Sequence, residues 1–184
     1  MERQPALMMS IRRWFVEALV NAASKGGNFI LNVTPDGEGL IQKAQIACLE
    51  KVGQWLKVNG EAVYGTTATP FGVELGSYDP VKKGKDGKPV FNPANEWRCT
   101  AKGDKLYIHI LKWPASGKLD LPGLQTKVVK ATLLAAPDTS VGVEQTAAGV
   151  TLSLPEKTPD PIDAVVRLDL AGPVAVVAAP NAAE

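Results

Sequence analysis

The sequence is poor in the residues that build metal centres and disulfide frameworks. Among 184 residues there are one histidine and two cysteines, and Cys48 and Cys99 do not form a CxxC pair. A structural zinc site takes about four such ligands at short spacings. We therefore expect no metal site and no disulfide, interpret both cysteines as buried or idle thiols, and assign no cofactor.

Long apolar runs are also missing. No stretch approaches the ~20 apolar residues that cross a bilayer, so we expect no membrane span. Residues 1–24 make a poor signal peptide, because Glu17 interrupts the apolar stretch and Arg12 and Arg13 lie within it. The compartment is left open.

No excess of one charge is present. Twenty basic and nineteen acidic residues nearly cancel, and they are interspersed along the chain. Binding to nucleic acid or to an anionic membrane surface depends on a concentrated basic patch. We therefore expect neither partner.

The first third of the chain reads as helix, buried strand, turn and helix. Apolar residues at helical spacing predict an amphipathic helix over 10–25, with Ser10 as its N-cap, and a second helix over 42–58 that stops at Asn59-Gly60. Trp14 and Trp55 are assigned to helix packing. Between the helices, residues 29–33 form an apolar run followed by a turn over 34–39.

An apolar run between two helices is typical of a parallel strand covered on both faces. A parallel strand needs strand neighbours to satisfy its backbone groups. The remaining sequence supplies no other strand-helix unit, so the predicted strand has no partner within the chain.

The rest of the chain reads as a linker followed by antiparallel strands. Residues 66–95 are rich in Gly, Pro, Thr and Lys, which predicts a linker or loop with a solvated segment at Lys82 to Lys88. Short runs separated by turn residues then predict an antiparallel β-sandwich. The runs are 97–101, 105–113, 118–121, 128–135, 141–146, 150–154, 164–170 and 174–178.

Alternation within one run assigns its two faces. Leu106, Ile108 and Ile110 fall on one face of their strand, and Tyr107 and His109 fall on the other. A turn is expected at Lys102-Gly103-Asp104, and residues 180–184 are read as a frayed tail.

Two segments resemble a known enzyme family. GGNFILNVTPDGEG, continued by EKVGQWLKVNGEAVYGT at residues 50–66, resembles the end of the catalytic domain in α-L-fucosidases of glycoside hydrolase family 29. WRCTAKGDKLYIHILKWP and the following GKLDLPGL resemble the start of that family's C-terminal β-sandwich. Two departures from the family pattern are mild changes within a turn: Thr34 replaces a usual Gly and Glu38 a usual Asp.

The resemblance implies an α+β chain, with the terminal βα portion of a (β/α)8 barrel followed by an antiparallel β-sandwich. Residues 1–65 would end the barrel, 66–95 would link, and 96–184 would form the sandwich. A whole barrel takes about 250 residues. The chain would then be part of a larger enzyme.

The implied activity is release of terminal α-L-fucose from a fucosylated glycan or fucoside by a retaining double displacement. This chemistry needs a carboxylate nucleophile and a second carboxyl group as acid/base. In the family both precede the GGN strand, so we carry over no catalytic residue and expect the chain to be inactive alone. His109 matches none of the family's substrate-contacting histidines, and the oligomeric state is left open.

Three residues near the predicted strand have alternative roles. Asp36 and Glu38 follow a barrel strand, where active-site loops lie, but Pro35-Asp36-Gly37 is also ordinary turn chemistry, and we favour the structural role. Asn32 ends an apolar strand, and it is our one candidate for substrate binding, with satisfaction of neighbouring backbone groups as the alternative.

A second function class is a non-catalytic carbohydrate-binding or structural β-sandwich module. Trp97, Tyr107 and Trp113 flank one predicted hairpin, and their aromatic faces suit the apolar face of a pyranose. Core or interdomain packing is the alternative that we favour for them.

Overall fold

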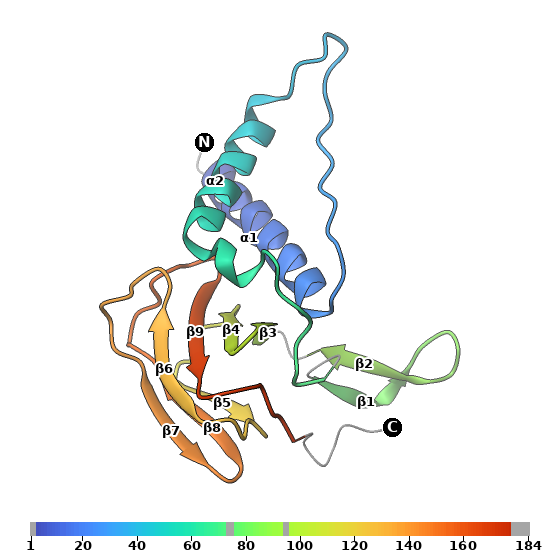
Figure 1. Ribbon diagram of the computed structural model, residues 1–184. Coiled ribbons are helices and arrows are strands. Elements are labelled where there is room, and N and C mark those ends of the chain that lie inside the picture. Colours follow the sequence, from blue (N-terminus) through green and yellow to red (C-terminus); the bar gives the residue numbers. More distant parts are fainter. Residues whose placement is uncertain (1–2, 73–75, 94–95, 178–184) are drawn as a thin grey trace.

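The structure is a computed structural model that describes residues 3–72, 76–93 and 96–177. A pair of helices stands on one end of a body of antiparallel sheets (Figure 1). The tail predicted at 180–184 lies outside the described residues. Among the described helices, none is long and apolar enough to span a membrane.

Both predicted helices are present, with one changed boundary. Helix α1 spans Arg3–Ser24 and α2 spans Lys43–Asn59. Ser10 therefore lies inside α1 and does not cap it, because the preceding residues continue the helix. Gly26 adopts a φ of 72°, which ends α1 in the usual left-handed conformation.

The end of α2 differs from a simple stop. Gly60 keeps a right-handed helical conformation, and the chain tightens into a 3-10 turn, η1, over Gly60–Ala62. This turn delivers Ala62 and Val63 to the surface of a β-sheet. The Asn59-Gly60 pair therefore marks a change of helix type.

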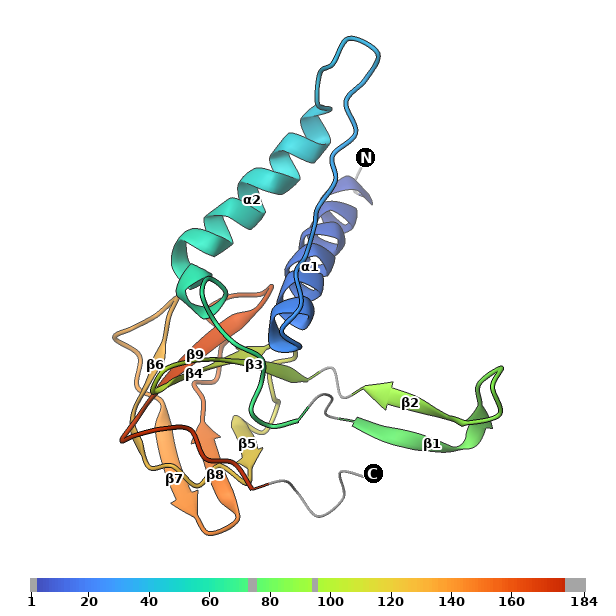
Figure 2. The same cartoon turned by 45° about the vertical axis from the view of Figure 1, so that its right-hand side comes forward.

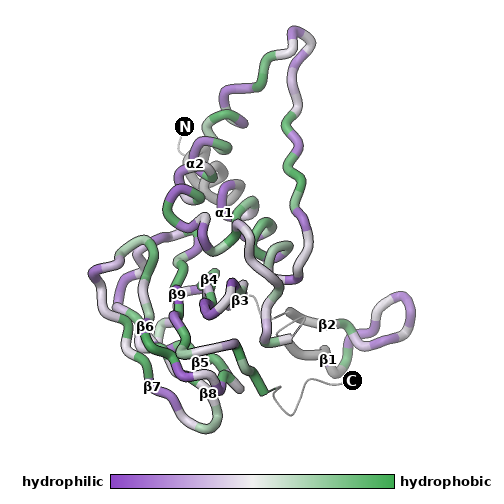
Figure 3. Tube along the Cα trace, in the orientation of Figure 1, coloured by the Kyte–Doolittle hydropathy of each residue, from purple (hydrophilic) through white to green (hydrophobic). Residues whose placement is uncertain are grey.

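The predicted strand at 29–33 is not formed. In the described part of the chain, residues 28–33 are extended but make no backbone hydrogen bond to another segment. The segment rises beside the helices toward the turn (Figure 2), and its apolar residues appear as green stretches in Figure 3. The prediction of a buried strand is wrong for this structure, because no neighbouring strand is there to pair with it.

The predicted linker contains a β-hairpin. Strand β1 (Gly76–Lys83) pairs antiparallel with β2 (Pro89–Pro93), and the hairpin projects from the body in both views (Figures 1 and 2). Gly87, with a φ of 76°, forms the turn. The loop expected over 66–95 is therefore partly replaced by paired strands, because backbone pairing across this turn overrides a loop-like composition, whereas residues 81–88 are exposed as expected.

The antiparallel strands predicted after residue 96 are confirmed, with one exception. A four-stranded sheet has the order β3-β4-β9-β6, formed by Trp97–Lys102, Lys105–Ile110, Ala164–Leu170 and Val128–Leu133. A three-stranded sheet has the order β5-β8-β7, formed by Lys118–Pro122, Gly149–Ser153 and Gly142–Thr146. The run at 174–178 forms only an isolated bridge, Leu124 to Val176, in its described part.

The two sheets enclose one apolar core. Leu106, Ile108 and Ile110 of β4 join Leu121 of β5 and Leu152 of β8 in a single buried cluster. Tyr107 and His109 point to the opposite face of β4, which the helices cover. The predicted alternation along this strand is therefore confirmed.

Helix α1 buries different residues from the expected Trp14, whereas α2 buries the expected Trp55. Val16 and Val20 of α1 and Trp55 of α2 are buried against the outer face of the four-stranded sheet. Trp14 is 59% exposed, so its assignment to packing is wrong, whereas that of Trp55 is confirmed. Helical spacing alone predicts that a helix has an apolar stripe, but it does not say which element that stripe packs on. Contact with the sheet decides which residues are buried.

Replacing the buried Leu168 with alanine tests the shared core. Leu168 has no exposed surface in the cluster between the sheets, so we expect Leu168→Ala to lower the free energy of unfolding by about 2–5 kcal/mol. The control is Val129→Ala on β6, which is 66% exposed and should change stability by less than about 0.5 kcal/mol. Urea denaturation measures both, and equal losses would contradict the assigned core.

Candidate functional site

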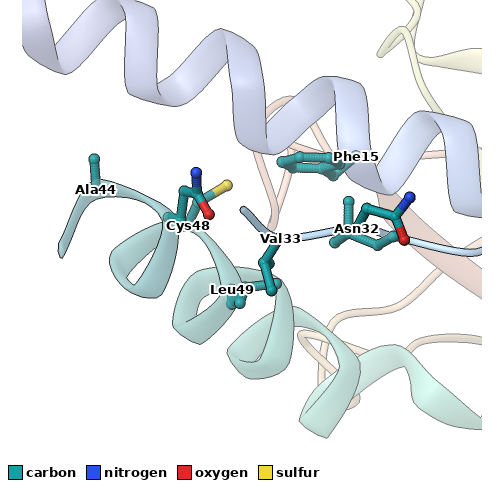
Figure 4. A pocket seen from close by; sticks show the side chains of 8 residues that line it. Phe15, Asn32, Val33, Ala44, Cys48 and Leu49 are labelled. Carbon is teal, nitrogen blue, oxygen red and sulfur yellow. The ribbon is translucent and has the colours of Figure 1, made fainter. Parts of the chain in front are cut away.

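A pocket lies between the extended segment and the two helices. Its volume is about 230 Å3, and Figure 4 shows Phe15 of α1 on one side and Cys48 and Leu49 of α2 on the other. The lining residues are Phe15, Leu31, Asn32, Val33, Ala44, Gln45, Cys48 and Leu49. The predicted binding residue, Asn32, is thus placed at a concave surface.

The polar groups of this pocket are few. Gln45 Oε1 accepts a hydrogen bond from the Thr34 backbone N–H at 3.1 Å, which ties the segment to α2. Asn32 is exposed and makes no hydrogen bond to another described residue. Burial raises the pKa of the Cys48 thiol, so it is a weak nucleophile.

The turn after the segment is organised by Asp36. Its Oδ1 accepts hydrogen bonds from the backbone N–H groups of Glu38 and Leu40, at 3.0 and 2.9 Å. The Asp36 N–H in turn donates to the Leu40 carbonyl. These contacts confirm the predicted local role of this carboxylate, and they leave Asp36 and Glu38 in an exposed turn.

A buried polar cluster, which sequence reasoning missed, lies beneath the helices. His109 Nδ1 is 2.8 Å from Asp163 Oδ2, and neither side chain has exposed surface. His109 Nε2 is 3.3 Å from the Ala62 carbonyl oxygen. The spacing of 54 residues between the two partners gives no local signal, so only the antiparallel pairing of β4 with β9 brings them together.

Thr100, His109 and Asp163 form a chain of hydroxyl, imidazole and carboxylate, because Thr100 Oγ1 is 3.4 Å from His109 Nε2. This is the order of nucleophile, base and acid in a catalytic triad. Its burial argues against catalysis. The Thr100 hydroxyl donates to the Ala62 carbonyl at 2.6 Å, and Thr100 and His109 have no exposed surface. A substrate therefore has no access to these atoms. The hydrogen bonds of the cluster instead hold η1 against the sheet.

The indole of Trp55 also links α2 to this cluster. Its Nε1–H donates to the Asp163 backbone carbonyl at 3.0 Å. At the rim, Tyr107 Oη donates to Glu61 Oε2 at 3.4 Å, and Glu61 pairs with Arg167 at 3.2 Å. Helix, 3-10 turn and sheet are therefore joined by polar contacts as well as by apolar packing.

The predicted aromatic trio is divided between two faces. Trp97 and Trp113 line a second pocket beside the β4–β5 connection, whereas Tyr107 is buried under the helices. The packing role favoured for Trp97 and Tyr107 is confirmed by their burial, at 7% and 1% exposed. Cys48 and Cys99 are both buried and free, as expected.

Ligand groups for a metal ion do not gather in the described part of the chain. No group of three or more His, Cys, Asp or Glu side chains there has the arrangement to hold an ion. His109 and Asp163 are each other's partners.

Comparison with known proteins relates the chain to an enzyme family. A family model described as α-L-fucosidase matches residues 4–61, which hold both helices and the segment between them. Human tissue α-L-fucosidase is 31% identical over 150 residues, or 81% of this chain. The chain is homologous to α-L-fucosidases of glycoside hydrolase family 29 over most of its length.

Solved α-L-fucosidases share its fold. The structure of the enzyme from Vibrio sp. strain EJY3 matches 89% of this chain with a TM-score of 0.68 at 26% identity. Isoenzyme 1 from Paenibacillus thiaminolyticus matches 86% with a TM-score of 0.65 at 30% identity. The chain spans 28% of the length of the human relative and 26% and 34% of these two solved chains.

Replacing Asp163 tests the fastening role of the buried cluster. Asp163→Ala removes the oxygen that lies 2.8 Å from His109 Nδ1, and leaving a buried polar group without its partner costs about 1–3 kcal/mol. We expect a loss of this size in the free energy of unfolding by urea denaturation. Glu17→Gln is the control, because the Glu17–Arg13 pair is exposed and should contribute less than about 1 kcal/mol. Similar losses in both variants would refute the role.

The alkaline stability of the protein tests the environment of Tyr107. Burial, reinforced by the Glu61 carboxylate, raises the pKa of Tyr107 from 10.0 to about 12. Between these values the unfolded state has lost the phenol proton and the folded state keeps it, so stability falls as pH rises. In urea denaturation from about pH 9 to about pH 11, wild type should lose more stability than Tyr107→Phe. Equal losses would contradict the shift.

Proposed function

We propose that this chain is the portion of an α-L-fucosidase that ends its catalytic barrel and carries its C-terminal β-sandwich. Residues 1–65 belong to the barrel, 66–95 connect the two parts, and 96–184 form the sandwich. The whole enzyme releases terminal α-L-fucose from fucosylated glycans or fucosides by a retaining double displacement. The nucleophile and the acid/base lie outside these residues, so the chain alone is inactive.

The observation that carries the proposal is the unpaired extended segment. Residues 28–33 are strand-like in sequence and conformation, and their backbone groups make no hydrogen bond to the described part of the chain. Ile30 is 84% exposed. An apolar strand with two open edges requires neighbouring strands, and the missing strands of a (β/α)8 barrel would supply them.

Exposed apolar side chains on the helical pair support the same reading. Exposed apolar surface often marks a site that another part of a protein covers. The exposed large apolar residues between α1 and the end of α2 are Trp14, Ile30, Leu40, Ile41, Ile46 and Val58. A barrel would cover these exposed side chains, whereas Val16, Val20 and Trp55 pack on the sheet.

Asn32 is the residue of this chain that we propose to contact substrate. It follows Leu31 in the extended segment and lines the pocket between the helices. Barrel enzymes bind substrate at the carboxyl ends of their strands, which is where Asn32 would lie. Asp36 keeps its structural role in the turn that follows.

A chimeric enzyme tests the proposal. The corresponding C-terminal part of P. thiaminolyticus α-L-fucosidase isoenzyme 1 is replaced by this chain, and hydrolysis of 4-nitrophenyl α-L-fucoside is measured. We expect activity in the chimera and none in the isolated chain. In the chimera, Asn32→Ala should raise KM or lower kcat by about tenfold, the effect of one lost hydrogen bond to substrate.

A matched control separates this role from general damage. Glu50→Gln changes an exposed residue of α2 that does not line the pocket, and should leave kcat/KM within about threefold. Fucose release by the isolated chain that disappears in Asp36→Asn would overturn both the inactivity and the structural role of Asp36.

A further inference from the structure

A second pocket lies outside the segment matched by the family model. It is formed where the start of β3 meets the connection from β4 to β5. Its volume is about 450 Å3, within the range of about 300–1,000 Å3 that small-molecule sites occupy. The side chains that matter for recognition are those of Glu96, Trp97, Lys112, Trp113, Lys118 and Asp120.

The aromatic wall of this pocket is held in place by its own contacts. The Trp113 indole N–H donates to the Pro155 carbonyl at 3.2 Å, and the side chain is half-buried. Trp97 packs edge-to-face on Phe71, with ring centroids 5.3 Å apart. Trp113 therefore offers a fixed, partly exposed ring, which suits stacking on a flat apolar surface of a ligand.

Donors and acceptors stand side by side at the rim. The Lys112 backbone N–H donates to the Glu96 carbonyl at 3.0 Å, so the two residues are neighbours. The side chains of Glu96, Lys112 and Lys118 are exposed and make no hydrogen bond or ion pair with another described residue. Asp120 Oδ1 accepts from the Thr151 hydroxyl at 2.6 Å.

This arrangement fits a polyhydroxylated ligand. A carboxylate only accepts and an ammonium group only donates, whereas a hydroxyl does both, so adjacent acids and lysines can satisfy adjacent hydroxyls. Two carboxylates and two ammonium groups sum to zero charge, which gives no preference for an ion. We propose that this pocket binds a neutral saccharide, with Trp113 stacked on one pyranose ring and Glu96 and Lys112 bonded to its hydroxyls.

The site is a binding site and takes no part in bond cleavage. Its function would be to hold a sugar, free or at the end of a glycan, on the sheet body. The proposal is argued only from residues of the β-sheet body and does not depend on the activity proposed above.

Nuclear magnetic resonance titration of the 184-residue chain tests this site. The probes are L-fucose, D-galactose, 2′-fucosyllactose, D-galacturonate and glycerol, and the readout is the indole N–H signals of the four tryptophans. We expect saturable shifts of the Trp113 signal with at least one neutral sugar at a Kd on the order of 1 mM. Tighter binding of the trisaccharide than of L-fucose identifies a glycan end, and equal binding identifies a free sugar.

Surface variants locate the ligand without disturbing the core. Glu96→Gln and Lys112→Met should each raise the Kd about tenfold, because each removes a charge-assisted hydrogen bond. Glu144→Gln on β7, an exposed residue that does not line the pocket, is the matched control and should leave the Kd unchanged. Trp113→Ala should abolish binding, provided that its far-ultraviolet circular dichroism matches wild type.

Three results would overturn the proposal. The first is no saturable shift with any neutral sugar, or one that glycerol reproduces. The second is tighter binding of D-galacturonate than of D-galactose, which would indicate an anion site built on the lysines. The third is binding that Glu96→Gln and Lys112→Met leave unchanged, since the sugar would then lie elsewhere.

Discussion

The buried contact between His109 and Asp163 is the interaction on which the arrangement of helices and sheets depends. Both side chains are without exposed surface, and the Ala62 carbonyl and the Trp55 indole meet the same cluster. Polar groups removed from water in this way are stable only when they satisfy one another. The contact therefore fixes how α2 and η1 sit on the four-stranded sheet.

Apolar packing around this contact completes the junction. Val16 and Val20 bring α1 against the sheet face that carries Tyr107 and Val165. The opposite face of the same sheet faces the three-stranded sheet across the shared core. The four-stranded sheet is consequently covered on both sides, and its strand β4 is buried at nearly every position.

The helical pair is unlike the sheets in how it is covered. Val16, Val20 and Trp55 are buried on the sheet, whereas Trp14 and Ile46 are exposed. A pocket lined by Asn32 lies between the helices and the extended segment (Figure 4). The chain is homologous to α-L-fucosidases over most of its length, and it spans about a third or less of the solved relatives. The rest of such an enzyme could cover the exposed apolar residues. The proposed role as the end of a barrel follows from the two observations together.

Local sequence determined the elements whose formation depends on nearby residues. The two helices, the turn at Asp36, the Lys102-Gly103-Asp104 hairpin and the alternation along β4 were all predictable, because spacing and turn chemistry act within a few residues. The family pattern at residues 26–66 identified the homology. The hydrogen bonds of Asp36 reach Glu38 and Leu40, which are only two and four residues away.

Tertiary structure alone decided what depends on distant partners. The extended segment at 28–33 stays unpaired, since a strand forms only where another strand supplies its hydrogen bonds. The helical face that is buried, Val16 and Val20 but not Trp14, was chosen by the sheet it meets. The pairs of His109 with Asp163 and of Glu96 with Lys112 exist because antiparallel strands bring remote residues into register, which no local pattern encodes.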